Sequence, residues 1–171
     1  SGLSPSDIEG AWAGLCEAYP DGMGGMSYID RQFQLTGDRW AIFGTVYGDD
    51  TCSDPLFSFF VDGEYEIEGP SETVDNAYNS FFGIERHEFV AFDSSMADLF
   101  NESGCGAGDW AVGVPQSVRE TGCIGVAHPA SDCAGENDLL QLDDNGILYF
   151  GERSVDLCNE RAPNINPYPL Y

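Results

Sequence analysis

The chain has 171 residues, enough for one domain with a hydrophobic core, and its 42% of hydrophobic residues excludes wholesale disorder. Its 30 acidic residues outnumber six arginines, and there is no lysine, so the formal net charge is −24. Such a surface repels nucleic acids and anionic membranes. Because the acidic residues are spread along the whole chain, the charge favours a salt-adapted, halophilic surface over a tail that recruits a basic partner.

Short apolar and aromatic segments follow one another along the chain, separated by Gly, Asp and Pro. We expect a linker or tag remnant over residues 1–7 and one domain over residues 8–171. Strands are expected over residues 8–18, 28–35, 40–47, 57–61, 64–68, 75–82, 85–92, 122–127, 138–142 and 147–152. So many short strands predict an all-β fold, an antiparallel β-barrel or half-open barrel.

Turn and capping residues mark the ends of several of these segments. Hairpin turns are expected at residues 36–38, 62–63 and 144–146, where Gly and Asp occur together. The one expected helix covers residues 94–101, with Asp93 or Ser94 as its cap. Met96, Leu99 and Phe100 would then share a buried face.

Six cysteines indicate a disulfide framework and therefore an oxidising compartment. They are Cys16, Cys52, Cys105, Cys123, Cys133 and Cys158. No pair has the spacing of a zinc or thioredoxin-type site, so we expect no metal ion and no cofactor. Six cysteines allow 15 full pairings, and spacing alone does not choose among them. The expected location is extracellular, periplasmic or at the cell surface.

Alternation along the strands indicates which side chains would line a barrel interior. The candidate ligand-binding residues are Trp40, Ile42, Phe57, Phe59, Val61, Tyr65, Ile67 and Phe89. A barrel of about eight strands leaves room for side chains or for one small apolar ligand. A filled core without a cavity is the alternative. In that case the acidic surface would contact a protein or a polysaccharide.

Catalytic signals are weak in this sequence. His87 and His128 are its only histidines, and no Gly-x-Ser-x-Gly motif is present. We therefore expect no enzyme, with a small hydrolase as a third alternative. Gly10-Ala11-Trp12 matches the Gly-x-Trp motif of lipocalins, in which an arginine packs over the indole, and Arg153 is the candidate for that contact.

Several blocks in order resemble the extracellular domain of the adenomatosis polyposis coli down-regulated 1 family. The blocks are Trp12, Cys16, Cys52, Cys105 and Cys123, then residues 146–153, Arg161-Ala162-Pro163 and Tyr168-Pro169-Leu170. The resemblance covers residues 8 to 171. It implies a calycin-like antiparallel barrel with a cavity that accepts lipid.

The resemblance also implies a disulfide pairing, Cys16 with Cys52 and Cys105 with Cys123, which leaves Cys133 and Cys158 for a third bridge. Animal members carry two such domains at the cell surface and antagonise Wnt signalling. This chain has one domain and an acidic surface, so we carry over the lipid-binding module and not the Wnt antagonism. The expected partner is a lipid or another hydrophobic small molecule, with neutral lipids favoured over fatty acids by the −24 charge. The oligomeric state is left open.

Overall fold

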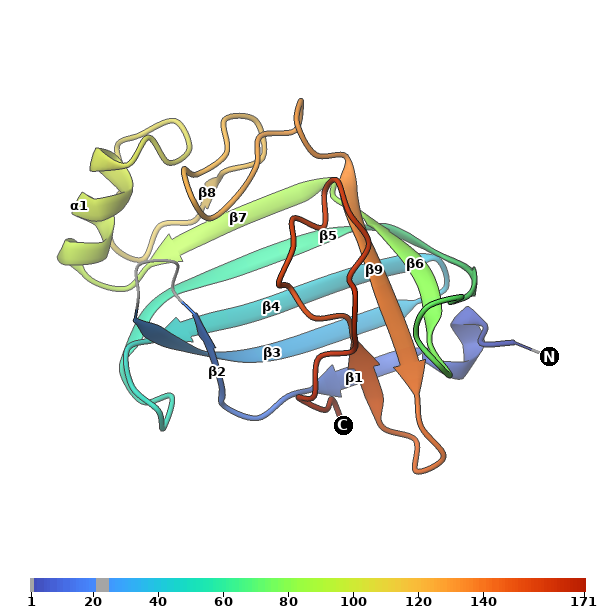
Figure 1. Cartoon of the computed structure of the whole chain (residues 1–171). Coiled ribbons are helices and arrows are strands. Elements are labelled where there is room, and N and C mark those ends of the chain that lie inside the picture. Colours follow the sequence, from blue (N-terminus) through green and yellow to red (C-terminus); the bar gives the residue numbers. More distant parts are fainter. Residues whose placement is uncertain (1, 21–24) are drawn as a thin grey trace.

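Ten antiparallel strands and one short α-helix make up the fold in the computed structural model, which describes residues 2–20 and 25–171 (Figure 1). The elements are η1 (Pro5–Asp7), β1 (Gly10–Ala13), β2 (Glu17–Pro20), β3 (Met26–Thr36), β4 (Arg39–Tyr47), β5 (Pro55–Pro70), β6 (Tyr78–Gly83), β7 (Arg86–Ala91), α1 (Ser94–Glu102), β8 (Gln116–Ser117), β9 (Gly135–Leu142) and β10 (Leu148–Phe150). The barrel follows the order β1-β3-β4-β5-β6-β9-β10.

The long strand β5 belongs to both halves of the barrel. The hairpin turn predicted at residues 62–63 is wrong, because β5 runs through Gly63 without turning. Gly63 lies so close to Gly83 that a Cβ atom at Gly63 would overlap the Gly83 carbonyl oxygen. Glycine is therefore required here for the close approach of two strands. As a result, Tyr65 lies on the same strand as Phe59.

The sheet forks along β5. Residues 57–62 of β5 pair with β7, whereas residues 65–70 pair with β6. The consecutive strands β6 and β7 do not pair with each other: β6 lies between β5 and β9, and β7 lies between β5 and β8. The strands β7 and β8 form a smaller lobe with α1 and the loops up to Ala127, at the upper left of Figure 1.

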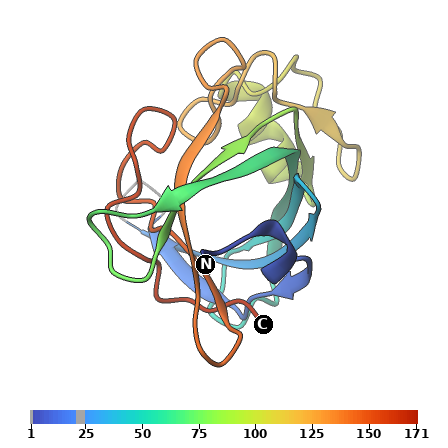
Figure 2. The same ribbon diagram turned by 90° about the vertical axis from the view of Figure 1, so that its right-hand side faces the viewer.

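The last two residues of the chain bring the two edges of the barrel together. Leu170 exchanges two backbone hydrogen bonds with Leu148 of β10, at 2.9 and 3.1 Å. Tyr171 does the same with Ala13 of β1, at 2.9 and 3.0 Å. Figure 2 shows the resulting ring of strands from the end at which η1 lies.

One end of the barrel is filled with apolar side chains. Phe33 stacks on Phe150 with ring centroids 4.3 Å apart, and Phe82 packs against the same ring at 5.3 Å. Ile8 is fully buried in this cluster, and Leu3 packs against it, although residues 1–7 were expected to be a linker. The barrel core therefore extends to the segment around η1.

The smaller lobe has its own apolar core. The predicted helix is confirmed, and Asp93 caps it by accepting a 2.8 Å hydrogen bond from the backbone N–H of Met96. Phe100 is buried as expected, but Leu99 is exposed, so the predicted face is wrong at that position. The strand expected over residues 122–127 is a tight loop, closed by a single bridge between Cys123 and Ala127.

Three disulfides link the chain: Cys16–Cys52, Cys105–Cys123 and Cys133–Cys158. This is the pairing that the family resemblance implied. The three bonds indicate an oxidising, extracytoplasmic compartment. Within the described ranges, α1 is the longest helix, and no helix has the length and hydropathy needed to cross a lipid bilayer.

Candidate functional site

The inward face of the large sheet is defined by strand register. Arg31 of β3 lies opposite Gly44 of β4, Gly44 lies opposite Phe59 of β5, and Phe59 lies opposite Phe89 of β7. A Cβ atom at Gly44 would overlap the Phe59 ring, so this ring lies over the glycine. Phe59 contacts both the barrel core and the core of the smaller lobe. It therefore lies at the junction of the two cores.

The eight residues expected to line a cavity separate into buried and accessible groups. Trp40, Ile42, Val61 and Tyr65 are buried in the barrel core, and Phe89 is buried in the core of the smaller lobe. Phe57, Phe59 and Ile67 are only partly buried. The accessible aromatic surface on the inward face is therefore at Phe57 and Phe59, whereas the other end of the barrel is filled.

Six ionisable side chains from β2, β3, β7, β9 and the segment after β10 form an interior polar cluster. They are Glu17, Arg31, His87, Glu136, Asp138 and Arg153. Arg153 links them, because its charge acts on the pKa of Arg31, His87 and Asp138 alike. Direct contacts join Arg31 to Glu17 and Arg153 to Glu136 and Asp138, whereas His87 is related to them through longer-range electrostatics.

A buried ion pair occupies one side of this cluster. Arg31 binds Glu17 through two contacts, Nε to Oε1 at 2.7 Å and Nη2 to Oε2 at 3.1 Å. Burial raises the pKa of Glu17 and lowers the pKa of Arg31, and in each case the partner's charge opposes that effect. Arg31 also lies over the ring of Phe33, at 5.7 Å from its centroid. The pair therefore joins β2 to β3 next to the barrel core.

Arg153 is accessible to solvent and is paired with two carboxylates. Its side chain is 57% exposed and pairs with Glu136 and, at 3.8 Å, with Asp138. Burial lowers the pKa of Arg153, but the two carboxylates together raise it above its ordinary value. Solvent therefore reaches Arg153, while its two carboxylate partners hold its positive charge in place. The predicted contact of Arg153 with Trp12 is wrong: cation–π contacts in the described chain involve Arg31 with Phe33 and Arg86 with Phe60.

His87 and Asp138 have strongly shifted protonation. Burial lowers the pKa of His87 to about 4, and its ring packs edge-on against Phe89, so the imidazole is neutral at pH 7. Burial raises the pKa of Asp138 to about 6, although its Oδ1 accepts hydrogen bonds from the backbone N–H groups of Leu139 and Gly151. The cluster therefore holds a neutral imidazole and a carboxyl group that titrates just below neutral pH.

Sequence reasoning missed this cluster, although it noted His87 as one of two histidines and Arg153 as a candidate partner of Trp12. One signal was present: Arg31 has the same strand parity as Phe33 and Leu35, which places its charge on the core-facing side of β3. Asp138 likewise has the parity of the buried Leu140 in β9. A charged residue at an inward position of a barrel strand is a recognisable candidate for a functional or paired group.

Grooves on the outer surface of the described residues include one beside Tyr65 and one over the first strands. The larger, of about 490 Å³, lies at the fork of the sheet beside Tyr65, and carboxylates of Asp38, Glu64, Glu66 and Glu85 surround it. The smaller, of about 300 Å³, lies on the outer face of β1, β3, β4 and β5.

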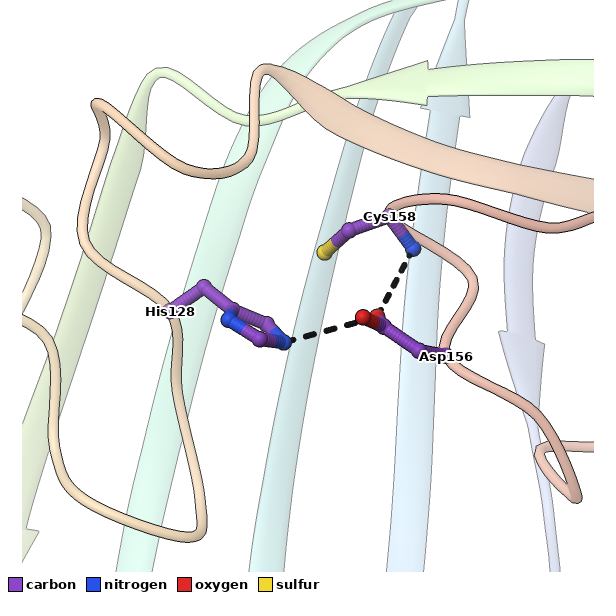
Figure 3. Close-up of side chains that lie close together, drawn as sticks. All are labelled: His128, Asp156 and Cys158. Atoms are coloured by element: carbon purple, nitrogen blue, oxygen red, sulfur yellow. Dashed lines mark hydrogen bonds and ion pairs between the residues drawn. The ribbon is translucent and has the colours of Figure 1, made fainter.

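His128, Asp156 and Cys158 lie close together between two loops (Figure 3). His128 Nε2 is 3.4 Å from Asp156 Oδ1, which also accepts the backbone N–H of Cys158 at 3.1 Å. Cys158 is bonded to Cys133, so its sulfur cannot act as a thiolate ligand. The contact joins the loop after β8 to the segment after β10 and does not form a three-ligand metal centre.

A scan of the sequence against protein-family models found no matching family, and a search of curated proteins found no matching sequence.

Proposed function

We propose that this protein binds a hydrophobic ligand, a lipid or acyl chain, on the inward face of its barrel, without catalysing a reaction. The observation that carries the proposal is the accessible aromatic pair Phe57 and Phe59, which faces inward while the rest of that face is filled. Arg153, whose charge acts on Arg31 and His87, has a side chain that is 57% exposed, so solvent reaches the polar groups of this cluster. An acyl chain displacing that solvent would gain about 0.8 kcal/mol for each buried methylene group.

The interior charges favour a neutral ligand. Arg31 is paired with Glu17, and Arg153 is paired with Glu136, so neither guanidinium is free to bind a carboxylate head group. The net charge of −24 adds a repulsive field for any anion. Esters and neutral lipids are therefore expected to bind more tightly than free fatty acids.

Three further features support a disulfide-bonded binding module that does not catalyse a reaction. The disulfide pairing is the one implied by the resemblance to the adenomatosis polyposis coli down-regulated 1 family, which itself remains a proposal. His87 is neutral and packed against Phe89, which suits a structural role better than proton transfer at neutral pH. His128 pairs with Asp156 at the surface, beside a disulfide.

A fluorescent acyl-ester probe tests the proposal by titration against wild type, Phe59→Asp and Phe60→Asp. The two substitutions are chemically identical and adjacent in β5, but Phe59 faces inward and Phe60 faces outward. We expect Phe59→Asp to abolish probe binding and Phe60→Asp to preserve it, with both variants checked for folding by circular dichroism. If wild type does not bind the probe, or if folded Phe59→Asp binds it equally well, the filled-core alternative replaces this proposal.

A further inference from the structure

The smaller outer groove is a separate feature that the interior site does not use. Register across the outer face places Gln32 of β3 opposite Phe43 of β4, and Phe43 opposite Phe60 of β5. These side chains alternate with the inward ones, so they point away from the barrel core. Neighbouring strands are about 4.8 Å apart, so the three residues extend over about 10 Å of open sheet surface.

Aromatic rings form the apolar part of this groove. Phe43 is 47% exposed, which is a large accessible area for a phenylalanine in the middle of a strand. Beside it, Phe60 is held in place, because the Arg86 guanidinium lies 4.8 Å from its ring centroid. Arg86 in turn donates hydrogen bonds of 2.8 and 3.1 Å to Asp62. The groove therefore presents one open ring next to one fixed ring.

Amide groups form the polar part. Gln32 is exposed and makes no side-chain hydrogen bond with any residue in the described ranges. Gln34 reaches only Thr36 Oγ1, at 3.4 Å. Each amide offers both a donor and an acceptor, and Tyr171, which is 57% exposed, adds a hydroxyl at the edge. These groups can hydrogen-bond a ligand rich in hydroxyl groups.

The side chains that line the groove carry no charge, and the nearby Arg86 is neutralised by its ion pair with Asp62. None of its lining side chains is acidic or basic, in a molecule with a net charge of −24. A neutral ligand avoids the repulsion that an anionic polymer would meet here. A pyranose ring combines an apolar C–H face, which stacks on aromatic rings, with hydroxyl groups at its edge, which hydrogen-bond to amides.

We propose that this outer groove binds an uncharged, β-1,4-linked polysaccharide chain, with a sugar ring stacked on Phe43 and its hydroxyl groups bound by Gln32 and Gln34. The flat, ribbon-like form of such a chain fits an open sheet face that crosses three strands. The proposal is independent of lipid binding, because its residues point to the opposite side of the sheet.

Native affinity electrophoresis in gels with hydroxyethylcellulose tests this proposal, and carboxymethylcellulose supplies the same backbone with negative charge. We expect hydroxyethylcellulose to retard wild type and carboxymethylcellulose not to. Calorimetry with cellohexaose should show binding about tenfold weaker for Phe43→Ala, the loss expected for one stacking contact. Gln32→Ala should also weaken binding, whereas Leu99→Ala, an exposed apolar residue of α1, should not.

Three results would overturn the proposal. They are no retardation of wild type, equal retardation of Phe43→Ala, and equal retardation in the charged polymer. Size-exclusion chromatography with light scattering tests a rival occupant: if wild type is a dimer and Phe43→Ala a monomer, the groove is a contact between copies of this chain. Phe59→Asp should leave cellohexaose binding unchanged, so failure of the lipid proposal would not affect this result.

Discussion

His87 should make the stability of this protein fall at acidic pH, and substitution of His87 should remove that pH dependence. The pKa of the imidazole is about 4 in the folded protein, against 6.5 for an unperturbed histidine. Between these values the unfolded state binds the proton and the folded state does not, so stability falls as the pH falls from 6.5 to 4. At 1.36 kcal/mol for each pKa unit, the full loss is about 3 kcal/mol, and most of it is reached by pH 4.5.

Asp138 should act in the opposite direction over nearly the same range. Its pKa is about 6 in the folded protein, against an ordinary value of 3.8. Between these values the folded state binds the proton and the unfolded state does not, so stability rises as the pH falls from 6 to 3.8, again by about 3 kcal/mol. The two residues should therefore nearly cancel in wild type.

Urea unfolding of His87→Gln and Asp138→Asn, at pH 7.5 and 4.5 and constant ionic strength, separates the two effects. Relative to wild type, His87→Gln should gain about 2–3 kcal/mol between pH 7.5 and pH 4.5, whereas Asp138→Asn should lose a similar amount. The His128→Gln variant, which removes an exposed histidine, is the control for the loss of an imidazole. If His87→Gln and His128→Gln show the same pH profile, His87 is not buried in its neutral form and the reasoning is refuted.

Three other predictions concern stability. The melting temperature should rise over the first few hundred millimolar of sodium chloride, because salt screens carboxylate repulsion. A melting temperature that stays constant or falls with added salt in thermal-unfolding measurements would contradict this. Gly63→Ala should destabilise the protein by at least about 2 kcal/mol in urea unfolding, because the new methyl group meets the Gly83 carbonyl, and a loss no larger than that of Gly48→Ala would contradict it. Serine at both Cys133 and Cys158 should cost about 3 kcal/mol, because the bridge closes a separation of 25 residues; unchanged calorimetric stability would argue against this.

The sequence allowed the local elements to be predicted because their signals are local. Continuous apolar and aromatic segments identified the strands around Trp40 and Phe57, and the cap at Asp93 marked the start of α1. The hairpin of β9 and β10 followed from an Asp-Asn-Gly turn, in which the Asp143 N–H donates to the Ile147 carbonyl.

Features that depend on distant contacts were not predicted. Asp62-Gly63 has the composition of a turn, and only its closeness to Gly83 explains why β5 continues there. The interior polar cluster assembles from β2, β3, β7, β9 and the segment after β10, so its members are far apart in the sequence. Among 30 acidic residues, composition alone does not single out Glu17 and Asp138, which are buried.

The contacts of Tyr171 with Ala13 have a consequence for how this molecule is expected to fold. They join residues near the two ends of the described chain, so they have the longest sequence separation of any backbone pairing in the barrel. Contacts of this kind carry a high loop-closure entropy and form late in folding. Before they form, β1 and β10 expose unpaired edges that can bind another chain. We therefore expect the ring to be completed late in folding, and aggregation during refolding to depend on how quickly Leu170 and Tyr171 dock.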